Sequence, residues 1–519
     1  MTRPPNILFL LTDQHRPDHL GFGGNPVIRT PNLDALARRS LQFTRAYVAN
    51  PICMPNRASI FTGRLPSAHG TRLNGIALDW GAQTFARGLR RQGYDTAYFG
   101  KCHLQSGNPR NDVQALLQPG RPAVDAFERG HPEGWDCWED AERHAGERVE
   151  MPTDFYGFDH VDLVVGHSDQ AGGHYFQWLK DQGVDPASLQ GPDKARPYAP
   201  LSQQVWRTAM PEELYPTRYI ANRTADFLRG RGEREAPFLA VCSFPDPHHP
   251  FTPPGRYFDM YDPADIPLPK TFDDPHERSA PHIRRMIANR GVEAGWVQPF
   301  APSEAQYREM AAKEYGMVTM IDDAVGEVLA SLEASGLAGD TIVIFTSDHG
   351  EMFGDHGLIM KGAMHYDGCI RVPLLIARPG EPGRVSRALA SSLDIAPTLL
   401  QLAGAPAYYG IQGASLVPVL DDANAVVRDH VLVEEDQFGD PYRTGRGLRM
   451  RTLRTESLRL TLYEGFDGGE LFDLRDDPDE LHNLFDEPSA QPLKAEAMER
   501  LARTLMGACD LAPIARAAA

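Results

Sequence analysis

The sequence contains little cysteine. Its 519 residues include six, which are widely spaced and form no Cys-x-x-Cys pair. This pattern is not a disulfide framework, and it is typical of proteins in a reducing compartment. Most of these cysteines are expected to be small buried residues. Cys53 is the exception, because its neighbours form a motif.

Long apolar runs are absent as well. No stretch is apolar enough over a sufficient length to span a bilayer. The apolar run over residues 7–11 is too short for the core of a signal peptide, and no small-residue cleavage site follows it. We therefore expect a cytoplasmic protein that does not interact with a membrane.

Positive charge is also scarce. The chain has 52 Lys and Arg against 70 Asp and Glu, which gives a formal net charge of −18. An acidic surface repels nucleic acids and anionic membranes, so neither is expected as a partner. A small anionic substrate remains compatible with this balance, because a local cationic pocket can form inside an acidic shell.

Strand-like and helix-like segments alternate over the first two thirds of the chain. The run Asn6–Thr12 is apolar throughout, as is typical of a strand buried on both faces. Further strands are predicted over residues 94–99, 238–244, 341–346 and 372–377, and helices over residues 30–37, 84–92, 216–228, 305–335 and 392–402. This alternation predicts right-handed crossovers and a large, mostly parallel α/β sheet sandwiched by helices.

Two regions depart from this alternation. Between residues 105 and 215, Gly, Pro, Asp, His and Trp are frequent, and we expect a long irregular insertion that covers the functional site. From about residue 421, short alternating runs precede a helix predicted over residues 492–506. We therefore predict an α/β domain over residues 1–420 and a small α+β domain on an antiparallel sheet over residues 421–519.

Two pairs of side chains suited to cation binding come directly after buried strands. Asp13 and Gln14 follow the first strand, and Asp348 and His349 follow the strand predicted over residues 341–346. A single Asp in such a place is more often a turn former. Two pairs at the ligand-binding edge of one sheet make a shared metal site the better interpretation.

Cys53 begins the segment Cys-Met-Pro-Asn-Arg. Pro55 suits the first turn of a helix, so Cys53 is expected near a helix N-terminus, where partial positive charge favours an anion. Arg57 lies one turn further on the same face and can reach back towards residue 53. The structural alternative is a buried cysteine that precedes a helix.

Cationic and proton-transferring side chains follow the other predicted strands. Lys101 and His103 come after residues 94–99, His248 comes after residues 238–244, and Lys361 follows the second metal pair. A lone Lys or His is more often a surface group. Their convergence on one edge of the sheet favours an anion-binding site.

These segments together resemble the formylglycine-dependent (type I) sulfatases of the alkaline phosphatase superfamily. The resemblance covers nearly the whole chain, with matching segments over residues 30–37, 53–63, 93–104, 347–357, 361–373 and 470–484. Cys102 stands where an aromatic residue is common in the family. The resemblance implies that residues 1–420 form the catalytic domain.

The resemblance implies that a formylglycine-generating enzyme oxidises Cys53 to an aldehyde, whose hydrate (a gem-diol) is the nucleophile. A serine would be left as a stable sulfate ester, whereas a gem-diol can release sulfate by re-forming the aldehyde. Arg57 would hold the hydrated aldehyde. One divalent metal ion would be bound by Asp13, Gln14, Asp348, His349 and the modified Cys53.

The resemblance also assigns roles to the remaining residues. Lys101 and Lys361 would bind the sulfate oxygens. His248 would protonate the leaving alcohol, and His103 would act as the base that breaks the hemiacetal. Asn74 would make a further contact to the ester.

Two residues depart from the common sulfatase pattern. Gln14 stands where many sulfatases have a second Asp, and His349 stands where many have Asn. Ca²⁺ is our first expectation for the metal ion, and Mn²⁺ becomes the alternative because only two carboxylates remain. The same pair also resembles the phosphonate monoester and phosphodiester hydrolases, which have Tyr and Thr at the positions of Lys101 and His103. Retention of Lys and His favours an arylsulfatase-like enzyme with promiscuity towards phosphonate and phosphate esters.

A third hypothesis is a non-catalytic, anion-binding relative. Such a protein would have lost Cys53, Arg57 or a metal ligand, and all of these are present. The substrate is expected to be a small anionic ester, selected by residues 105–215 and the loop near residues 275–300. By analogy with the family, we expect a homo-oligomer.

Overall fold

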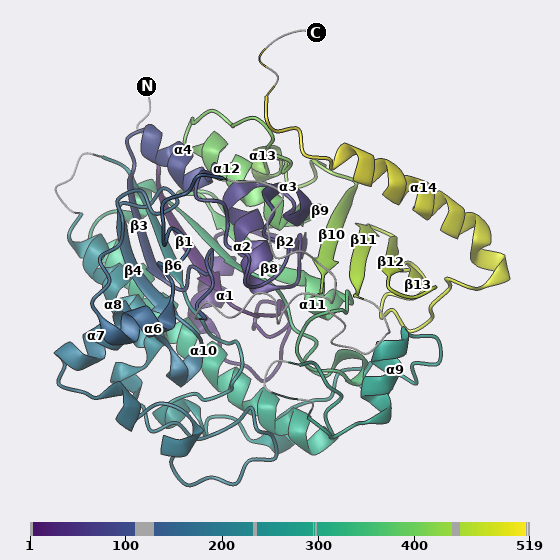
Figure 1. The fold of residues 1–519 in the computed structure, drawn as a ribbon, viewed down its shortest axis with the longest axis horizontal. Helices are drawn as coiled ribbons and strands as arrows, with labels where there is room; N and C mark the ends of the chain where they lie inside the picture. Colours follow the sequence, from purple (N-terminus) through teal and green to yellow (C-terminus); the bar gives the residue numbers. More distant parts are fainter. Residues whose placement is uncertain are drawn as a thin grey trace.

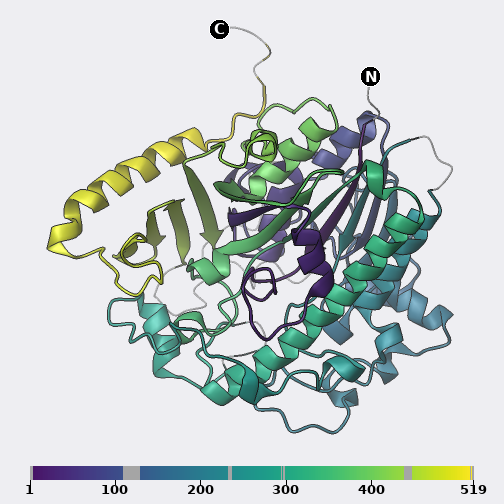
Figure 2. The same ribbon diagram turned by 180° about the vertical axis from the view of Figure 1, so that it is seen from behind.

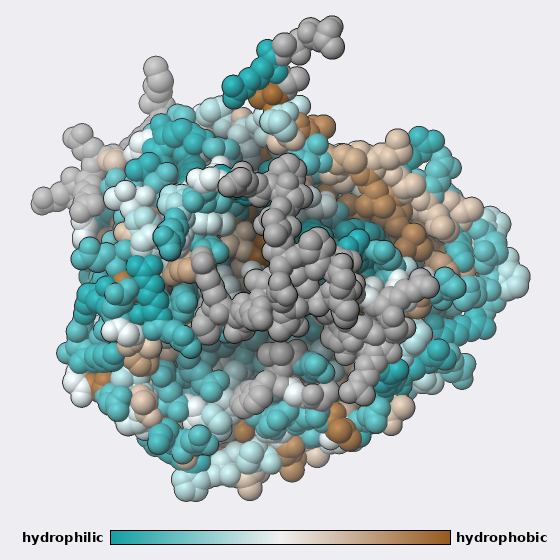
Figure 3. Space-filling model, in the orientation of Figure 1, coloured by the Kyte–Doolittle hydropathy of each residue, from teal (hydrophilic) through white to brown (hydrophobic). Residues whose placement is uncertain are grey.

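The computed structural model describes residues 4–108, 129–231, 236–293, 295, 298–437, 447–514 and 516. Figure 1 shows a large sheet with helices on both faces and a smaller sheet beside it, next to the long helix α14. In the space-filling view of Figure 3, this face is mainly hydrophilic, and hydrophobic residues gather along α14. Among the helices in the described ranges, none combines the length and apolarity of a membrane-spanning segment.

The large sheet has nine strands in the order β5-β4-β3-β6-β1-β7-β8-β2-β9. Its strands are β1 (Asn6–Thr12), β2 (Leu41–Tyr47), β3 (Asp95–Gly100), β4 (His160–Val165), β5 (Gly172–Gly173), β6 (Phe238–Ser243), β7 (Thr341–Ser347), β8 (Arg371–Ala377) and β9 (Arg384–Ser391). The five strands β4, β3, β6, β1 and β7 are parallel neighbours. β8 is antiparallel to both β7 and β2. The predicted large, mostly parallel sheet is confirmed.

β1 is the middle strand of the large sheet, and helices cover both of its faces. Its alternate residues divide between two cores, with Leu8 and Leu10 in one and Ile7, Phe9 and Leu11 in the other. Burial of each such side chain stabilises the fold by about 1.5–3 kcal/mol. The first core includes residues of α1 (Pro31–Ala37), α7 (His174–Asp181), α8 (Pro216–Arg229) and α10 (Glu304–Ala334), and Figure 2 shows α10 crossing this face.

The opposite core is formed by shorter helices. It includes residues of α2 (Cys53–Thr62), α4 (Phe85–Arg91), α12 (Ile395–Leu402) and α13 (Val417–Asp421). The remaining helices in the described ranges are α3 (Pro66–His69), α6 (Ala141–Gly146), α9 (Pro281–Ala288) and α11 (Asp367–Ile370), besides α14 and short 3-10 turns. α4 begins where the sequence predicts, because the Thr84 side chain accepts a hydrogen bond from the Arg87 backbone N–H and caps the helix.

The small sheet is antiparallel and contains β10 (His430–Asp436), β11 (Arg449–Thr455), β12 (Leu458–Glu464) and β13 (Gly469–Asp473). α14 (Gln491–Gly507) covers it, and Leu453 and Leu460 pack with Ala497 and Leu501 in one core. The predicted antiparallel sheet and final helix are confirmed. We propose that the chain divides into two domains at residues 420/421, which lie at the end of α13 and precede β10.

The region predicted to be an irregular insertion contains regular elements. Its described part includes β4, β5, α6 and α7, and β4 extends the large sheet by pairing with β3. The first three residues of β4 are partly or fully exposed, and two of them are polar. The strand therefore does not form a continuous apolar run in the sequence. The strands β2 and β9 were also missed. Residues 109–128 of the predicted insertion lie outside the described residues.

Candidate active site

The predicted site residues come together at one edge of the large sheet. The parallel order places the carboxyl ends of β3, β6, β1 and β7 side by side, and ligands bind at such an edge. The residues that follow these strands are Asp13 and Gln14 after β1, Lys101 and His103 after β3, His248 after β6, and Asp348 and His349 after β7. α2 faces this edge with its N-terminus.

Cys53 is the first residue of α2 and is 2% exposed. Its Sγ lies 3.8 Å from Asp13 Oδ1 and 3.2 Å from His349 Nε2. The pKa of the thiol is lowered: burial and Asp13 oppose ionisation, but the positive charges of Lys361, Lys101 and His349 outweigh them. The helix start at Cys53 agrees with the sequence-based prediction.

Arg57 joins the two aspartates of the site. Its Nε donates to Asp348 Oδ2 at 2.7 Å, and its Nη2 lies 3.3 Å from Asp13 Oδ2. All three side chains are fully buried. Burial raises the pKa of Asp13, but the charges of Lys101 and Arg57 lower it by more, so this carboxylate stays ionised. The guanidinium thus compensates two buried negative charges.

Four donor groups of the kind that bind metals surround one point. One ligand atom from each of Asp13, Cys53, Asp348 and His349 lies within 4.8 Å of the others. His349 Nδ1 makes a 2.9 Å hydrogen bond to the Gly350 carbonyl oxygen, so Nδ1 carries a proton, and in the neutral ring Nε2, which faces Cys53 Sγ, is the nitrogen that can bind a cation. Two carboxylates and an imidazole therefore fit a divalent cation.

Gln14, the other predicted metal ligand, adjoins these four groups and is hydrogen-bonded to Lys361. Lys361 Nζ donates to Gln14 Oε1 at 2.7 Å, and Gln14 Nε2 donates to Glu351 Oε2 at 2.6 Å. Gln14 also uses its backbone N–H, which donates to Asp348 Oδ1 at 3.1 Å. Glu351, which sequence reasoning did not select, therefore fixes the orientation of the Gln14 amide.

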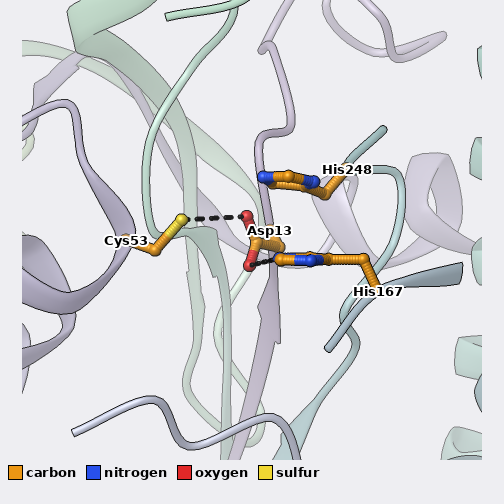
Figure 4. A group of neighbouring side chains, drawn as sticks. All are labelled: Asp13, Cys53, His167 and His248. Atoms are coloured by element: carbon orange, nitrogen blue, oxygen red, sulfur yellow. Dashed lines mark hydrogen bonds and ion pairs between the residues drawn. The ribbon is translucent and has the colours of Figure 1, made fainter. Parts of the chain in front are cut away.

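Lys101 and His248 lie on the other side of Asp13, together with His167. Lys101 Nζ contacts both an Asp13 oxygen and His167 Nε2. The His167 and His248 rings are stacked, with centroids 3.7 Å apart and an interplanar angle of 14° (Figure 4). Burial, followed by the charges of His167 and Lys361, lowers the pKa of His248 well below its ordinary value.

His167 was missed by sequence reasoning. It lies two residues after β4 in the segment Gly166-His167-Ser168, and a single histidine carries no spacing signal. Recognition of β4 as a parallel neighbour of β3 would have placed His167 beside Lys101.

His103 is held by a carboxylate that was also not predicted. Glu139 accepts hydrogen bonds from the backbone N–H groups of His103, Leu104 and Gln105, at 2.5, 2.9 and 3.0 Å. His103 has a positive φ of 55°, which is uncommon for a residue with a side chain. Burial and then Lys101 lower the pKa of His103 well below its ordinary value.

Asn74 lies against the first turn of α2. Its Oδ1 accepts a 3.1 Å hydrogen bond from the Met54 backbone N–H. This contact satisfies one of the free N–H groups at the helix N-terminus. All of the residues predicted from the sequence therefore gather around the start of α2 and the adjoining sheet edge.

Comparison with protein families identifies this architecture. The family model described as sulfatase matches residues 5–128 and 164–405. A second model, described as the C-terminal part of N-sulphoglucosamine sulphohydrolase, matches residues 354–506. Together the two models cover the small sheet and the large sheet except for most of β4.

Individual relatives agree with the family models. An arylsulfatase from Clostridium perfringens is 31% identical over 490 residues, which cover 92% of this chain and 90% of the relative. An N-acetylglucosamine-6-O-sulfatase from Bacteroides thetaiotaomicron is 25% identical and covers 97% and 86% of the two chains.

Solved structures show the same fold. The phosphonate monoester hydrolase of Agrobacterium radiobacter aligns with a TM-score of 0.76 at 26% identity, over 98% of this chain and 96% of the other. A structure in complex with its substrate D-glucosamine-2-N,6-O-disulfate aligns with a TM-score of 0.72 at 23% identity, over 98% and 99% of the two chains. On the family match, the relatives and the fold, the chain belongs to the sulfatase family and is a sulfuric ester hydrolase.

Proposed function

We propose that this sulfatase uses a formylglycine hydrate formed from Cys53 as its nucleophile. The observation that carries the proposal is the position of Cys53, at the start of α2 with its Sγ 3.2 Å from His349 Nε2 and 3.8 Å from Asp13 Oδ1. A hydrated aldehyde at this residue has one hydroxyl to attack sulfur and a second whose collapse releases sulfate.

We propose that Asp13, Gln14, Asp348 and His349 hold one divalent cation beside residue 53. When bound, the cation would favour ionisation of the hydrate and neutralise charge on the transferred group. Calcium is the first choice because two carboxylates and an amide oxygen are hard ligands. The imidazole of His349 makes Mn²⁺ the alternative.

The two lysines are proposed to bind the sulfate oxygens from opposite sides of the site. Each ammonium is anchored to a proposed metal ligand, Lys101 to Asp13 and Lys361 to Gln14. Such anchoring fixes the positive charges before substrate arrives, so little reorganisation is needed during the reaction. Arg57 is proposed to hold the hydrated aldehyde beside the two carboxylates that it pairs with, and Asn74 to contact the ester.

The two histidines are proposed to move protons. The Nδ1 of His248 is paired with the His249 carbonyl oxygen at 2.5 Å, which leaves its Nε2 for the leaving group. A bound sulfate ester brings negative charge that raises the pKa of His248, and the ring then acts as the acid. His103 is proposed as the base, since its lowered pKa keeps it unprotonated.

A phosphonate or phosphate ester hydrolase activity at the same site is the second candidate. It is favoured by Gln14 and His349 and by the likeness to the phosphonate monoester hydrolase structure. A multifunctional alkaline phosphatase superfamily protein from Trinickia caryophylli is also 29% identical to this chain. Rates on an aryl sulfate and a phenyl phosphonate ester decide the preference, and faster phosphonate turnover would contradict the sulfatase preference.

The natural substrate is proposed to be a small anionic ester, and a formylglycine-generating enzyme is proposed as the maturation partner. Relatives named for aryl sulfate, choline sulfate and N-acetylglucosamine-6-sulfate show how varied such esters are. We also propose a homo-oligomeric state, which light scattering would measure. The wide spacing of the six cysteines along the sequence, with no Cys-x-x-Cys pair, supports the proposed cytoplasmic location.

Mass spectrometry of the peptide that contains Cys53, together with metal analysis of the same sample, tests the mechanism. Protein from a host with a formylglycine-generating enzyme should show the aldehyde and one divalent ion per chain. A Cys53→Ala variant should lose at least about 10³-fold in kcat. An unmodified thiol in active protein, or full activity of Cys53→Ala, would overturn the proposal.

A further inference from the structure

A second group of ligand-type side chains overlaps the proposed metal site. It consists of Asp13, Cys53, His167 and His248, and one ligand atom from each lies within 4.8 Å of the others. Figure 4 shows the two imidazoles stacked on the side of Asp13 that faces away from α2. A sulfur, two imidazole nitrogens and a carboxylate oxygen form a donor set typical of Zn²⁺.

The Lys101 ammonium already supplies a cation to this group. Its Nζ contacts an Asp13 oxygen and His167 Nε2, so it lies between two of the four side chains. A divalent cation bound there would have to displace the ammonium or be repelled by it. Lys101 is 2% exposed, and its charge is compensated by the fully buried Asp13. In this arrangement, Asp13 and His167 bind the ammonium group of Lys101.

His167 reaches Lys101 because of the strand order. β4 is the parallel neighbour of β3, so the loop after β4 lies beside the loop that carries Lys101. The nitrogen that receives the ammonium N–H must be unprotonated, which places the His167 proton on Nδ1. The flat face of the same His167 ring stacks on the ring of His248, and the two ring centroids are 3.7 Å apart. One side chain thus contacts the proposed sulfate-binding lysine and the proposed acid.

We propose that His167 is a positioning residue for sulfate ester hydrolysis: it fixes the Lys101 ammonium by a hydrogen bond and the His248 ring by stacking. The inference deepens the proposed function and rests on the role of Lys101 in sulfate binding. A lysine has a flexible four-carbon stem, so its charge is well placed only when other groups hold it. Loss of such placement costs rate even when folding is intact.

Two variants separate the two contacts of His167. His167→Phe keeps a flat ring that can stack on His248 but removes the acceptor for Lys101. His167→Gln keeps an acceptor oxygen but removes the ring. If Lys101 is the main target, kcat/KM should fall about 10–100-fold in His167→Phe, and His167→Gln should recover part of that loss.

A double-mutant cycle with Lys101→Met tests whether His167 acts through the lysine. In the Lys101→Met background, the further loss caused by His167→Phe should be less than about twofold, because coupled residues are not additive. Binding of inorganic sulfate, measured by thermal shift, gives a second readout without turnover. His167→Phe should weaken sulfate binding in the wild-type background and leave it unchanged in the Lys101→Met background.

The outcomes distinguish this inference from the proposed function. Equal losses in both backgrounds would overturn the positioning role of His167 while leaving the role of Lys101 intact. Full activity of Lys101→Met would overturn both. Metal analysis should give one ion per chain in wild type and in His167→Phe. A second zinc equivalent that His167→Phe loses would overturn the inference in favour of a second metal site.

Discussion

Two arginines in this protein are buried to the same extent and paired in the same way. Arg57 in the active site is fully buried between Asp13 and Asp348. Arg459 in the small sheet is fully buried between Glu470 and Glu480, at 2.8 and 2.5 Å. Each guanidinium therefore compensates two carboxylates that burial would otherwise make very unfavourable.

The difference lies in what else the carboxylates contact. Glu480 uses its second oxygen to accept the Asp367 backbone N–H at 2.9 Å, and the Arg459 guanidinium lies over the rings of Tyr366 and Phe472. Asp348 Oδ1 likewise accepts a backbone N–H, from Gln14, but this oxygen and Asp13 Oδ1 also approach the ligand-type atoms of His349 and Cys53. The same buried ion pair thus closes one site and leaves the other open to a cation.

The largest effect is expected from Arg57→Met. Removal of the guanidinium leaves Asp13 and Asp348 uncompensated, which should lower the free energy of unfolding of the metal-free protein by about 3–5 kcal/mol. Activity should fall by at least about 10²-fold, because the support of residue 53 is lost. Denaturant unfolding and steady-state kinetics measure the two losses.

Because Asp13 and Asp348 are proposed to bind a cation as well as Arg57, the effect of added cation on Arg57→Met can also be measured. A divalent cation can replace part of the lost positive charge, so added Ca²⁺ or Mn²⁺ should raise the Tm of Arg57→Met more than that of wild type. An equal rise in both proteins would contradict the view that Asp13 and Asp348 are shared by the arginine and the cation.

Arg459→Met should have a similar effect on stability and a much smaller one on catalysis. The free energy of unfolding should fall by about 3–5 kcal/mol, since Glu470 and Glu480 lose their partner. kcat of the folded fraction should stay within about threefold of wild type, and added cation should not restore the Tm. A large loss of kcat at full folding would show that the two ion pairs are not functionally distinct.

Glu139→Gln should have the smallest effect on stability. Glu139 is a buried residue whose side chain accepts hydrogen bonds from backbone N–H groups. Burial raises the pKa of Glu139 from 4.5 to about 7, although three backbone N–H groups favour its ionised form. Its contribution to stability is therefore fully present below pH 4.5 and is lost as the pH rises through 7. When the pH is raised from 5 to 8, the free energy of unfolding of Glu139→Gln should fall by about 1–3 kcal/mol less than that of wild type.

Glu470→Gln is a matched control for this pH dependence, because its carboxylate is paired with Arg459. Denaturant unfolding of both variants at pH 5 and pH 8 gives the comparison. An unchanged pH dependence in Glu139→Gln would contradict a raised pKa for the carboxyl group at this position.

The sequence predicts the parts of the site that depend on local order. β1, the start of α2 at Cys53, and the pairs after β1 and β7 follow from apolar runs and short motifs. His167 and Glu139 could not be found in this way, because their positions depend on how the chain between β3 and β6 folds back. β4 has exposed residues at its start, so its pairing with β3 is not apparent from hydrophobicity. The strands β2 and β9 were missed because partly buried or exposed residues interrupt their buried ones.

Because Cys53 is buried in the folded protein, its proposed modification must take place before folding is complete. At 2% exposure, the thiol is accessible to another enzyme only before the site closes around it. His349, which packs against its sulfur, is added to the chain 296 residues later. At a synthesis rate of about 5–20 residues per second, this interval lasts roughly 15–60 s. If Cys53 is modified during synthesis as proposed, the distance along the chain between these two residues would set the time available for the modification.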